Sequence, residues 1–459
     1  NANHRVNATA VFEQSYDNNF NHTGTAYGLD YIDRIGINNL AWSNAELATN
    51  SSDRVINTLM SGMLRVNYVF MNRYMVTASI RADGSSRLVD KWSYFPSAAL
   101  AWDLKQESFL KDNSFIDQLK LRLGYGSVGN QAVEAYRPYS KRTPIRNSDG
   151  STSYKVDRPA APYLKWERND QFNAGVDFGI LNGRIRLTAD WYSKLSKDIL
   201  LDLAQPTHMG FPSLLMNSGE IKNTGIEFTI SADPFTGKGF SWHTDVTLSH
   251  NKGTFNSIPT ANHRQQQAGS FQNQLFQMIE GEKLGTFWGY TFGGIWQEDE
   301  VNAPFVDANG QTNGKTNGEV YKVVAGNSKY VDTNKDGVLN DADQGIIGCG
   351  QPTFNWGWNN SFNYKNFDFS FFMVGFHGFD IYNATHQMGF NTVSGQNMAA
   401  VTPMRDFLNR WTPTNTNTDV PGFVQGGTEN KVFSSRFVEN GSFIKMKSIT
   451  LGYTLPELA

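Results

Sequence analysis

The stretch from Thr353 to His377, TFNWGWNNSFNYKNFDFSFFMVGFH, decides the fold. In its first half aromatic residues alternate with asparagine, glycine and serine, and the alternation is broken only at Asn360. A period of two places these aromatic side chains on one face of an extended strand. After Lys365-Asn366 a second alternating run follows, so the stretch predicts an antiparallel hairpin with one apolar and one polar face.

The length of these two runs separates the possible all-β architectures. Strands in globular sheets average about five or six residues, whereas a tilted strand that crosses a bilayer needs about nine to eleven. The runs before and after Lys365-Asn366 fit the longer class. The hairpin therefore favours a transmembrane antiparallel β-barrel over a β-sandwich.

Composition supports the same fold class. The 459 residues are 39% hydrophobic and 18% charged, and no apolar run approaches the length of a transmembrane helix. Aromatic residues make up 13% of the chain and there are 42 glycines, a mixture that suits strands with aromatic girdles joined by polar loops. The formal net charge of -3 argues against a nucleic-acid partner, and the single cysteine, Cys349, excludes an internal disulfide.

About twelve strands can be recognised along the chain, and short and long connections alternate between them. Short turns on the periplasmic side and longer loops outside are typical of outer-membrane barrels. Because an open sheet edge in lipid would leave backbone groups unsatisfied, twelve strands indicate part of a larger barrel. The predicted segments begin with a short strand at Arg5–Phe12, then a hairpin from Met60 through Ile80, strands at Tyr94–Asp103 and Leu119–Ser127, hairpins around Asn182-Gly183 and Pro234–Lys238, the opening hairpin, and a last strand at Phe443–Tyr453.

One segment has the spacing of a calcium-binding loop. From Asp332 to Asp343 the sequence is DTNKDGVLNDAD, which matches the calcium-loop pattern at positions 1, 3, 5 and 6 and ends in a carboxylate at position 12. Oxygen ligands at this spacing can surround a hard cation, although Asp343 is shorter than the usual glutamate. A solvated Asp/Asn/Gly turn is the alternative. The candidate calcium ligands are Asp332, Asn334, Asp336, Val338 through its carbonyl, Asn340 and Asp343.

No motif points to catalysis. Gly124–Gly129 fits G-x-G-x-x-G, but no crossover helix or second parallel strand follows it, so nucleotide binding is not expected. The sequence has neither H-E-x-x-H nor G-x-S-x-G, and the acidic run Glu298–Glu300 fits a solvated loop better than a glycosidase pair. The chain is therefore not expected to be an enzyme.

Aromatic residues in or near the long connections are a weaker signal. Such rings can stack on sugars or clasp peptides, and the favoured alternative is interfacial anchoring or packing between loops. The candidate substrate contacts are Trp166, Trp288, Tyr290 and Trp296.

Several stretches together resemble the SusC/RagA-type TonB-dependent outer-membrane transporters of Bacteroidetes, and they occur in that family's order from about Arg5 to the end. They are SIRADGSSRL (79–88), YFPSAALAW (94–102), LKLRLGYGSVGNQ (119–131), NTGIEFTISA (223–232), YVDTNKDGVLNDADQGIIG (330–348) and SFIKMKSITLGYTLP (442–456). The resemblance implies a 22-stranded barrel with an N-terminal plug, an energy-coupling segment recognised by TonB, and an extracellular SusD-like lipoprotein lid. It also implies that 332–343 is a calcium-binding loop on the outer side.

The resemblance covers only part of such a transporter. Residues 1–459 are expected to be the C-terminal portion of the barrel, with the plug, the coupling segment and the N-terminal domains outside this sequence. The chain stops at Leu458-Ala459 without the aromatic-ended strand that usually closes such barrels, so the last strands are also expected to be missing. Gating and energy-coupling residues are therefore not expected here.

The resemblance implies TonB-dependent import, at the bacterial outer membrane, of a glycan or peptide too large for porins. The expected partners are a SusD-like lipoprotein, the TonB complex through the absent N-terminal region, and outer-membrane lipid, and a dimer of transporter–lipoprotein pairs is among the expected assemblies. The alternative is a secreted or surface β-rich binding or adhesive protein with a structural calcium loop. Solubility of the intact protein without detergent would favour that alternative.

Overall fold

The fold is described from a computed structural model that covers residues 3–28, 38–131, 133–211, 213–237, 239–258, 263–265, 275–389, 405–422 and 432–455. Twelve long strands form one sheet in which each strand pairs with the next of the set along the chain. The predicted number of about twelve is confirmed. The strands are β1 (His4–Thr25), β2 (Thr49–Phe70), β3 (Tyr74–Ser85), β4 (Trp92–Asp103), β5 (Ile116–Asn130), β8 (Glu167–Ile180), β9 (Ile185–Lys197), β12 (Glu220–Thr236), β13 (Phe240–Ser257), β22 (Phe354–Tyr364), β23 (Phe367–His377) and β26 (Phe443–Tyr453).

Shorter elements lie in the connections between these strands. They are β6 (Lys141–Arg146), β7 (Thr152–Arg158), β10 (Leu200–Ala204), β11 (Ser213–Asn217), β14 (His263–Gln265), β15 (Phe276–Met278), β16 (Thr286–Tyr290), β17 (Phe292–Ile295), α2 (Glu298–Asn302), β18 (Pro304–Val306), β19 (Thr312–Thr316), α3 (Asn317–Tyr321), β20 (Ser328–Tyr330), the 3-10 helix η5 (Asp341–Asp343), β21 (Gln344–Cys349), β24 (Asp380–Tyr382), α4 (Ala384–Gly389) and β25 (Val438–Asn440). Within the described ranges, no helix is long and apolar enough to span a membrane.

The chain divides into two compact units. The first consists of Asn1–Lys111, Lys120–Ala174 and Lys194–Gly219, and the second of Asp112–Leu119, Gly175–Ser193 and Glu220–Ala459.

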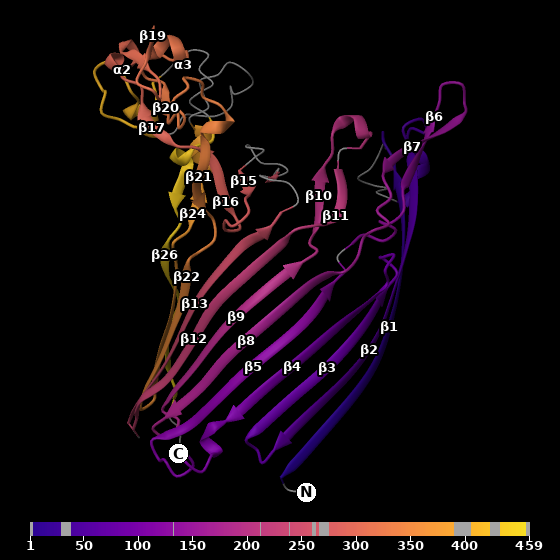
Figure 1. The fold of residues 1–459 in the computed structure, drawn as a ribbon, viewed down its shortest axis with the longest axis vertical. Helices are drawn as coiled ribbons and strands as arrows, with labels where there is room; N and C mark the ends of the chain where they lie inside the picture. The colour runs from indigo at the N-terminus through magenta and orange to yellow at the C-terminus, as the bar shows by residue number, and fades with distance from the viewer. Residues whose placement is uncertain are drawn as a thin grey trace. The chain divides into compact units, whose positions relative to one another are not determined.

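In the first unit, β1 to β4 lie side by side as antiparallel neighbours (Figure 1). Their register places apolar and aromatic residues next to one another across the four strands. Val6 pairs with Tyr68, Tyr68 with Val76, and Val76 with Leu100. Alternate residues along each strand point to opposite faces. The alternation read from the sequence therefore gives this part of the sheet one continuous apolar face.

Strands β1 and β2 are each 22 residues long, so the predicted ends at Phe12 and Met60 were wrong. Beyond Phe12 the two strands continue as a ladder rich in Asn, Thr, Ser and Asp, in which Tyr16 pairs with Thr58 and Phe20 with Arg54. Both faces of this extension carry polar residues, so it has no hydrophobic period to reveal it. Main-chain hydrogen bonds, which any sequence without proline can make, hold it together.

Four connections on one side of the sheet are short, and most on the other side are long. The short turns are those between β2 and β3, β8 and β9, β12 and β13, and β22 and β23. The connection at 104–115 is an exception, since it lies on the short side and is longer than the 86–91 connection on the other side. Two hairpins, β6–β7 and β10–β11, stand in long connections where the sequence showed no period.

In the second unit, the opening stretch forms the predicted hairpin. Strands β22 and β23 pair from Phe354 with His377 to Tyr364 with Phe367, and β13 lies on the other side of β22. Asn360, which breaks the alternation, lies on the aromatic face yet is fully buried there. Its Oδ1 accepts a hydrogen bond of 3.0 Å from Trp242 Nε1, and the Trp242 ring stacks on Phe362 at 5.8 Å. The asparagine is thus a covered polar partner for a tryptophan N–H group.

The short-turn side of the first unit is held together by one carboxylate. Glu107 accepts hydrogen bonds from Arg73 Nη1 at 3.1 Å, Tyr74 Oη at 2.7 Å and Trp102 Nε1 at 3.0 Å. These bonds, with that from Tyr74 the strongest and the Arg73 charge adding to them, hold the pKa of Glu107 below its ordinary value of 4.5 against the opposing effect of desolvation. The carboxylate therefore joins the β2–β3 turn to the end of β4.

A Glu107→Gln variant is expected to unfold at a lower temperature than the wild type at pH 7. Because the pKa of Glu107 is lowered in the folded state, its contribution to stability is present above pH 4.5 and is lost as the pH falls through the folded pKa. The difference between the two proteins should therefore shrink on acidification. Thermal unfolding from pH 7 to pH 3 measures this, and a constant difference would contradict a charge-dependent role.

Candidate functional site

The candidate calcium loop follows β20 in the second unit and runs into η5. Turn-forming residues shape it: Lys335 and Gly337 have φ angles of 55° and 80°, in the left-handed region. The Asn334 Oδ1 atom accepts from Asp336 N at 3.1 Å, and Asp336 Oδ1 accepts from Val338 N at 2.8 Å. Such side-chain-to-backbone bonds two residues apart are typical of Asx turns. The Asp/Asn/Gly spacing therefore folds the loop back on itself through local contacts.

Gly337 stands where the loop packs most closely on its surroundings. A Cβ atom at this position would lie 2.6 Å from Val320 Cγ1 and 2.9 Å from Phe305 Cζ. Both the positive φ angle and this close approach require glycine. The sharp turn of the loop is thus fixed against α3 and β18.

The two ends of the loop are closed by carboxylates. Asp343 is only 3% exposed, and its Oδ1 and Oδ2 atoms accept from Thr333 N at 2.9 Å and Asn340 N at 3.0 Å. Asp332 Oδ2 accepts from Gly337 N and from Tyr321 Oη, each at 2.8 Å. Positions 1 and 12 of the pattern are therefore both oriented by hydrogen bonds.

Asp332 also has an oxygen without a partner. Its Oδ1 atom is buried and accepts no hydrogen bond from the described residues. A buried carboxylate oxygen without a donor is costly, and a bound cation removes that cost. The lack of a donor at this oxygen is the feature of the loop that best fits a bound metal ion.

The remaining candidate ligands fit calcium less directly. Within the described ranges, no group of three or more His, Cys, Asp or Glu side chains converges as a metal site. The loop pattern depends instead on a mixture of carboxylate, amide and carbonyl oxygens, which a search for charged clusters does not count. Asn340 Oδ1 caps η5 by accepting from Ala342 N at 2.8 Å, and position 9 of calcium loops often binds through water. The Val338 carbonyl accepts from Asn340 Nδ2 at 3.1 Å.

The negative charges of this loop affect the pKa of Tyr321. Burial raises the pKa of Tyr321 well above its ordinary value, and the hydrogen bond to Asp332 and the charges of Asp332, Asp343 and Asp336 raise it further. The three carboxylates thus produce a common negative field beside one half-buried phenol. Sequence reasoning missed Tyr321, because nothing in its local pattern shows that α3 packs against the loop.

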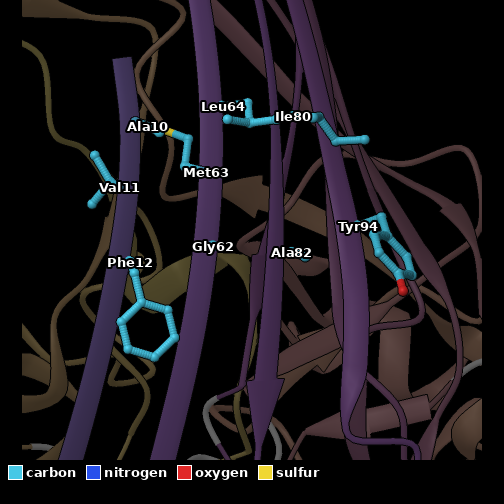
Figure 2. Close-up of a pocket in the computed structure, with 9 residues that line it drawn as sticks. All are labelled: Ala10, Val11, Phe12, Gly62, Met63, Leu64, Ile80, Ala82 and Tyr94. Atoms are coloured by element: carbon cyan, nitrogen blue, oxygen red, sulfur yellow. The ribbon is translucent and has the colours of Figure 1, made fainter.

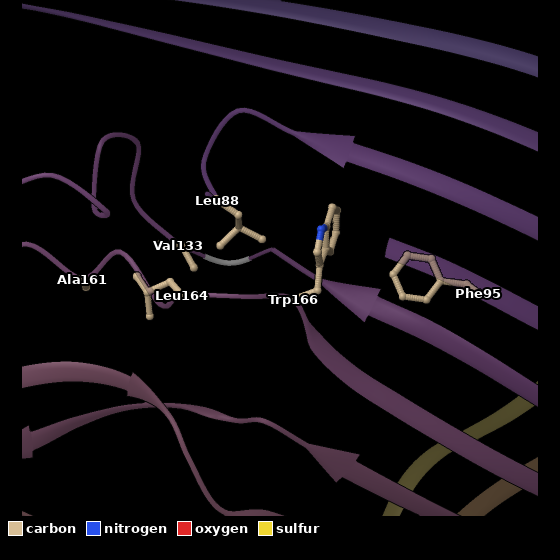
Figure 3. Close-up of a cluster of buried hydrophobic side chains, with 6 residues drawn as sticks. All are labelled: Leu88, Phe95, Val133, Ala161, Leu164 and Trp166. Carbon is tan, nitrogen blue, oxygen red and sulfur yellow. The ribbon is translucent and has the colours of Figure 1, made fainter. Parts of the chain in front are cut away.

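Trp166 lies in the first unit and away from the loop residues along the chain. It is 8% exposed, its Nε1 atom donates to the Lys91 carbonyl at 3.0 Å, and its ring meets Phe95 edge-on at 5.7 Å. Figure 3 shows it within a cluster of buried side chains. The cluster consists of Leu88, Phe95, Val133, Ala161, Leu164 and Trp166. The ring is therefore packed inside this unit, with little surface for a ligand.

The other three aromatic candidates lie in the second unit. Tyr290 contacts Tyr330 at 5.8 Å between ring centroids, and Trp288 lies two residues before it on β16. Trp296 is buried, contacts the Tyr321 ring at 5.6 Å, and has Lys329 Nζ 4.8 Å above its own ring. A cavity of about 360 Å³ beside the candidate calcium loop is lined in part by Trp296, Tyr321 and Tyr330. Among the four aromatic candidates, Trp296 is thus the one that lines this cavity beside the 332–343 loop.

Comparison with known families identifies the chain. The family model described as TonB dependent receptor-like, beta-barrel matches residues 2–320. The chain belongs to this family. TonB-dependent receptors are outer-membrane transport proteins and not enzymes, which agrees with the expected location and with the expected lack of catalysis.

Curated relatives narrow this TonB-dependent receptor to the SusC/RagA type. TonB-dependent receptor P3 of Formosa agariphila is 33% identical over 408 residues, covering 87% of this chain and 39% of that protein. TonB-dependent receptor SusC of Bacteroides thetaiotaomicron is 30% identical over 428 residues, covering 90% of this chain and 40% of that protein. The chain thus spans about two fifths of the length of these relatives.

Solved structures support the fold of this receptor. The RagAB peptide transporter superposes with a TM-score of 0.79 over 99% of this chain and 47% of that chain, at 20% sequence identity. At this identity the match concerns the fold alone. In a TonB-dependent receptor barrel the apolar face of the sheet meets lipid and the short turns face the periplasm. The secreted-protein alternative does not fit this family.

Proposed function

We propose that the full-length protein imports a large nutrient, a glycan or a peptide, across the outer membrane by TonB-dependent transport. The observation that carries the proposal is the family match over residues 2–320, together with strands of the length that a bilayer requires. The solved neighbour named a peptide transporter supports the peptide class. The glycan class rests on the resemblance of the sequence to the SusC/RagA type.

The connection between β13 and β22 supports recognition of a large ligand outside the membrane. It forms small sheets, β16 with β21 and β17 with β20, and its Leu275 and Phe287 pack in a buried cluster with Phe433 of the connection between β23 and β26. A shared core of this kind can hold aromatic side chains in fixed positions. Trp296 and the cavity that it lines are the most suitable contacts for a sugar face or a peptide side chain. Trp166, Trp288 and Tyr290 remain weaker candidates.

The proposed partners follow from the SusC/RagA type. We propose a SusD-like lipoprotein that covers the outer connections, and the TonB complex, which would act through a region outside these residues. A dimer of such transporter–lipoprotein pairs is the proposed assembly.

We also propose that the 332–343 loop binds a structural calcium ion. Asp332, Asp336 and Asp343 would supply charge, Asn334 and the Val338 carbonyl neutral oxygens, and Asn340 a contact through water. The ion would supply positive charge that fixes the loop. The buried, unpartnered Asp332 Oδ1 atom supports this site.

Uptake by cells tests the transport proposal. A strain that lacks the full-length gene is compared with its parent for uptake of fluorescent oligosaccharide and peptide pools, with and without an intact TonB. Loss of uptake of one pool, in both the deletion strain and the TonB-deficient strain, is expected and identifies the substrate class. Unchanged uptake of both pools would contradict import. Mass spectrometry of the purified protein then identifies a co-purifying lipoprotein and bound ligand.

A further inference from the structure

A trough crosses the apolar face of β1 to β4 in the first unit. In the register, Phe12 pairs with Gly62, Gly62 with Ala82, and Ala82 with Tyr94. The two small residues thus form a floor between two exposed rings, as Figure 2 shows; Phe12 is 70% exposed and Tyr94 is 63% exposed. No heavy atom lies within 4 Å of the place where a Gly62 Cβ would stand. The resulting cavity has a volume of about 550 Å³.

The trough is placed at a definite depth in the membrane. Four rings at the short-turn end, those of Tyr68, Phe70, Tyr74 and Trp102, follow one another at centroid distances of 6.2–6.5 Å and mark the periplasmic interface. Gly62 lies six residues beyond Tyr68 on β2. That is about 20 Å along the strand. Because the strands of such barrels tilt by about 40°, this distance along the strand corresponds to a depth of roughly 15 Å from the ring end of an apolar band that is about 25 Å tall. The trough therefore lies in the outer half of the bilayer.

A polar pocket continues the trough toward the outer surface. Two residues further toward the outer surface, Met60 follows Gly62 on β2 and Gly84 follows Ala82 on β3. There the lining contains both apolar and polar residues. The pocket has a volume of about 240 Å³, and its lining includes Gln14, Thr58, Ser85, Lys91 and Trp92. The change from apolar to polar lining along one direction matches an amphipathic ligand.

Lys91 supplies the one cationic group of this pocket. Its backbone is fixed, because its carbonyl accepts from Ser85 N and from Trp166 Nε1, each at 3.0 Å. None of the ion pairs found among the described residues involves its ammonium group, and its side chain is exposed. Beside it, the Trp92 indole lies over Gly84, where an added Cβ would be 2.8 Å from Trp92 Cε2. An exposed lysine on a fixed backbone, next to an exposed tryptophan, is suited to an anionic headgroup.

We propose that the trough and the polar pocket together hold one anionic lipid of the outer half of the membrane, by one acyl chain and one phosphate group. An acyl chain lies across Gly62 and Ala82 between the rings of Phe12 and Tyr94, and the phosphate lies beside Lys91. A second copy of the protein is a poorer occupant, because a surface for a protein partner would not need a cation directly beyond a narrow apolar trough.

Native mass spectrometry of the full-length protein in detergent tests this site, with dipalmitoyl phosphatidylglycerol as the probe. Wild type is expected to retain one lipid per chain. Gly62→Leu places a side chain in the trough at a position where a Cβ atom has no neighbour within 4 Å. It should raise the lipid concentration needed for half-occupancy at least tenfold, and Ala82→Leu should act likewise. The matched control is Ala98→Leu, which adds the same group to an exposed alanine on the same face of the sheet but outside the trough. It should bind as wild type does.

The headgroup contact is tested separately. Lys91→Gln should weaken binding of phosphatidylglycerol several-fold and leave binding of dipalmitoyl phosphatidylcholine, which has no net charge, unchanged. Equal lipid binding by wild type, Gly62→Leu and Ala82→Leu would overturn the proposal. Loss of a protein dimer in Gly62→Leu, with lipid binding unchanged, would overturn it in favour of a second copy.

Discussion

A Trp358→Arg substitution in the full-length protein is expected to destabilise the folded barrel by about 2–4 kcal/mol, the cost of an arginine on the lipid face near the bilayer midplane. Trp358 stands near the middle of β22, on the face that carries the aromatic side chains, and is 37% exposed. Its ring meets Phe371 edge-on at 5.4 Å and its Nε1 donates to Thr244 Oγ1 at 3.0 Å. The change removes these contacts and places a charge in lipid. Urea unfolding in lipid vesicles and the gel mobility of unheated samples measure the loss.

Asn359→Arg is the matched control, since it introduces the same charge one residue away on the opposite face. There Asn359 pairs with Asp245 on β13 and with Phe372 on β23. An arginine beside Asp245 gains a carboxylate partner in place of lipid, so the stability is expected to change little. Equal losses at the two positions would contradict the assignment of the aromatic face to lipid.

Much of the barrel sheet could be predicted from sequence because lipid and lumen impose a period of two on each strand. That period located the β22–β23 hairpin, whose turn at Lys365-Asn366 the structure confirms. It failed beyond Phe12, where β1 and β2 leave the apolar band and both faces become polar. Main-chain pairing and exposed side-chain contacts between the two strands, such as Arg54 Nε with Asn18 Oδ1 at 2.9 Å, remain there, and a single strand's sequence does not carry that information.

The candidate site shows a similar division. The turns of the 332–343 loop depend on contacts between neighbouring residues, so the sequence could predict where the chain folds back, and calcium binding there stays a prediction. The contact of Tyr321 with Asp332 and the fixed backbone of Lys91 both depend on segments that are brought together by the fold. Trp166 shows why the sequence could not distinguish a ligand contact from a packed ring. An aromatic residue beside a long connection has the same sequence pattern whether its ring is exposed or, as here, packed against Phe95.

Asp332→Asn is expected to weaken calcium binding by the full-length protein about 10- to 100-fold or more. Affinity in such loops depends on the number of charged ligands, and even removal of an outer hydrogen bond to a ligand typically costs 10–100-fold. Tyr321→Phe removes the hydrogen bond to Asp332 and should therefore weaken binding about tenfold or more. Calorimetry with calcium alone measures the affinity, and protease cleavage of the loop with and without a chelator reports its order. In wild type, chelation should speed cleavage.

The choice of variant separates a metal site from a hydrogen-bonded turn. Removal of Asp343 would leave the Thr333 and Asn340 N–H groups without acceptors and would loosen the loop whether or not it binds metal. An asparagine at 332 can still accept from Gly337 N and Tyr321 Oη, so its main loss is the charge that a cation requires. Asp341→Asn removes an equal charge from the same loop at an exposed position outside the ligand pattern and should bind calcium nearly as wild type does. If chelation leaves cleavage of the wild type unchanged, and Asp332→Asn and Asp341→Asn behave alike, the Asx hydrogen bonds alone hold the loop and it binds no calcium.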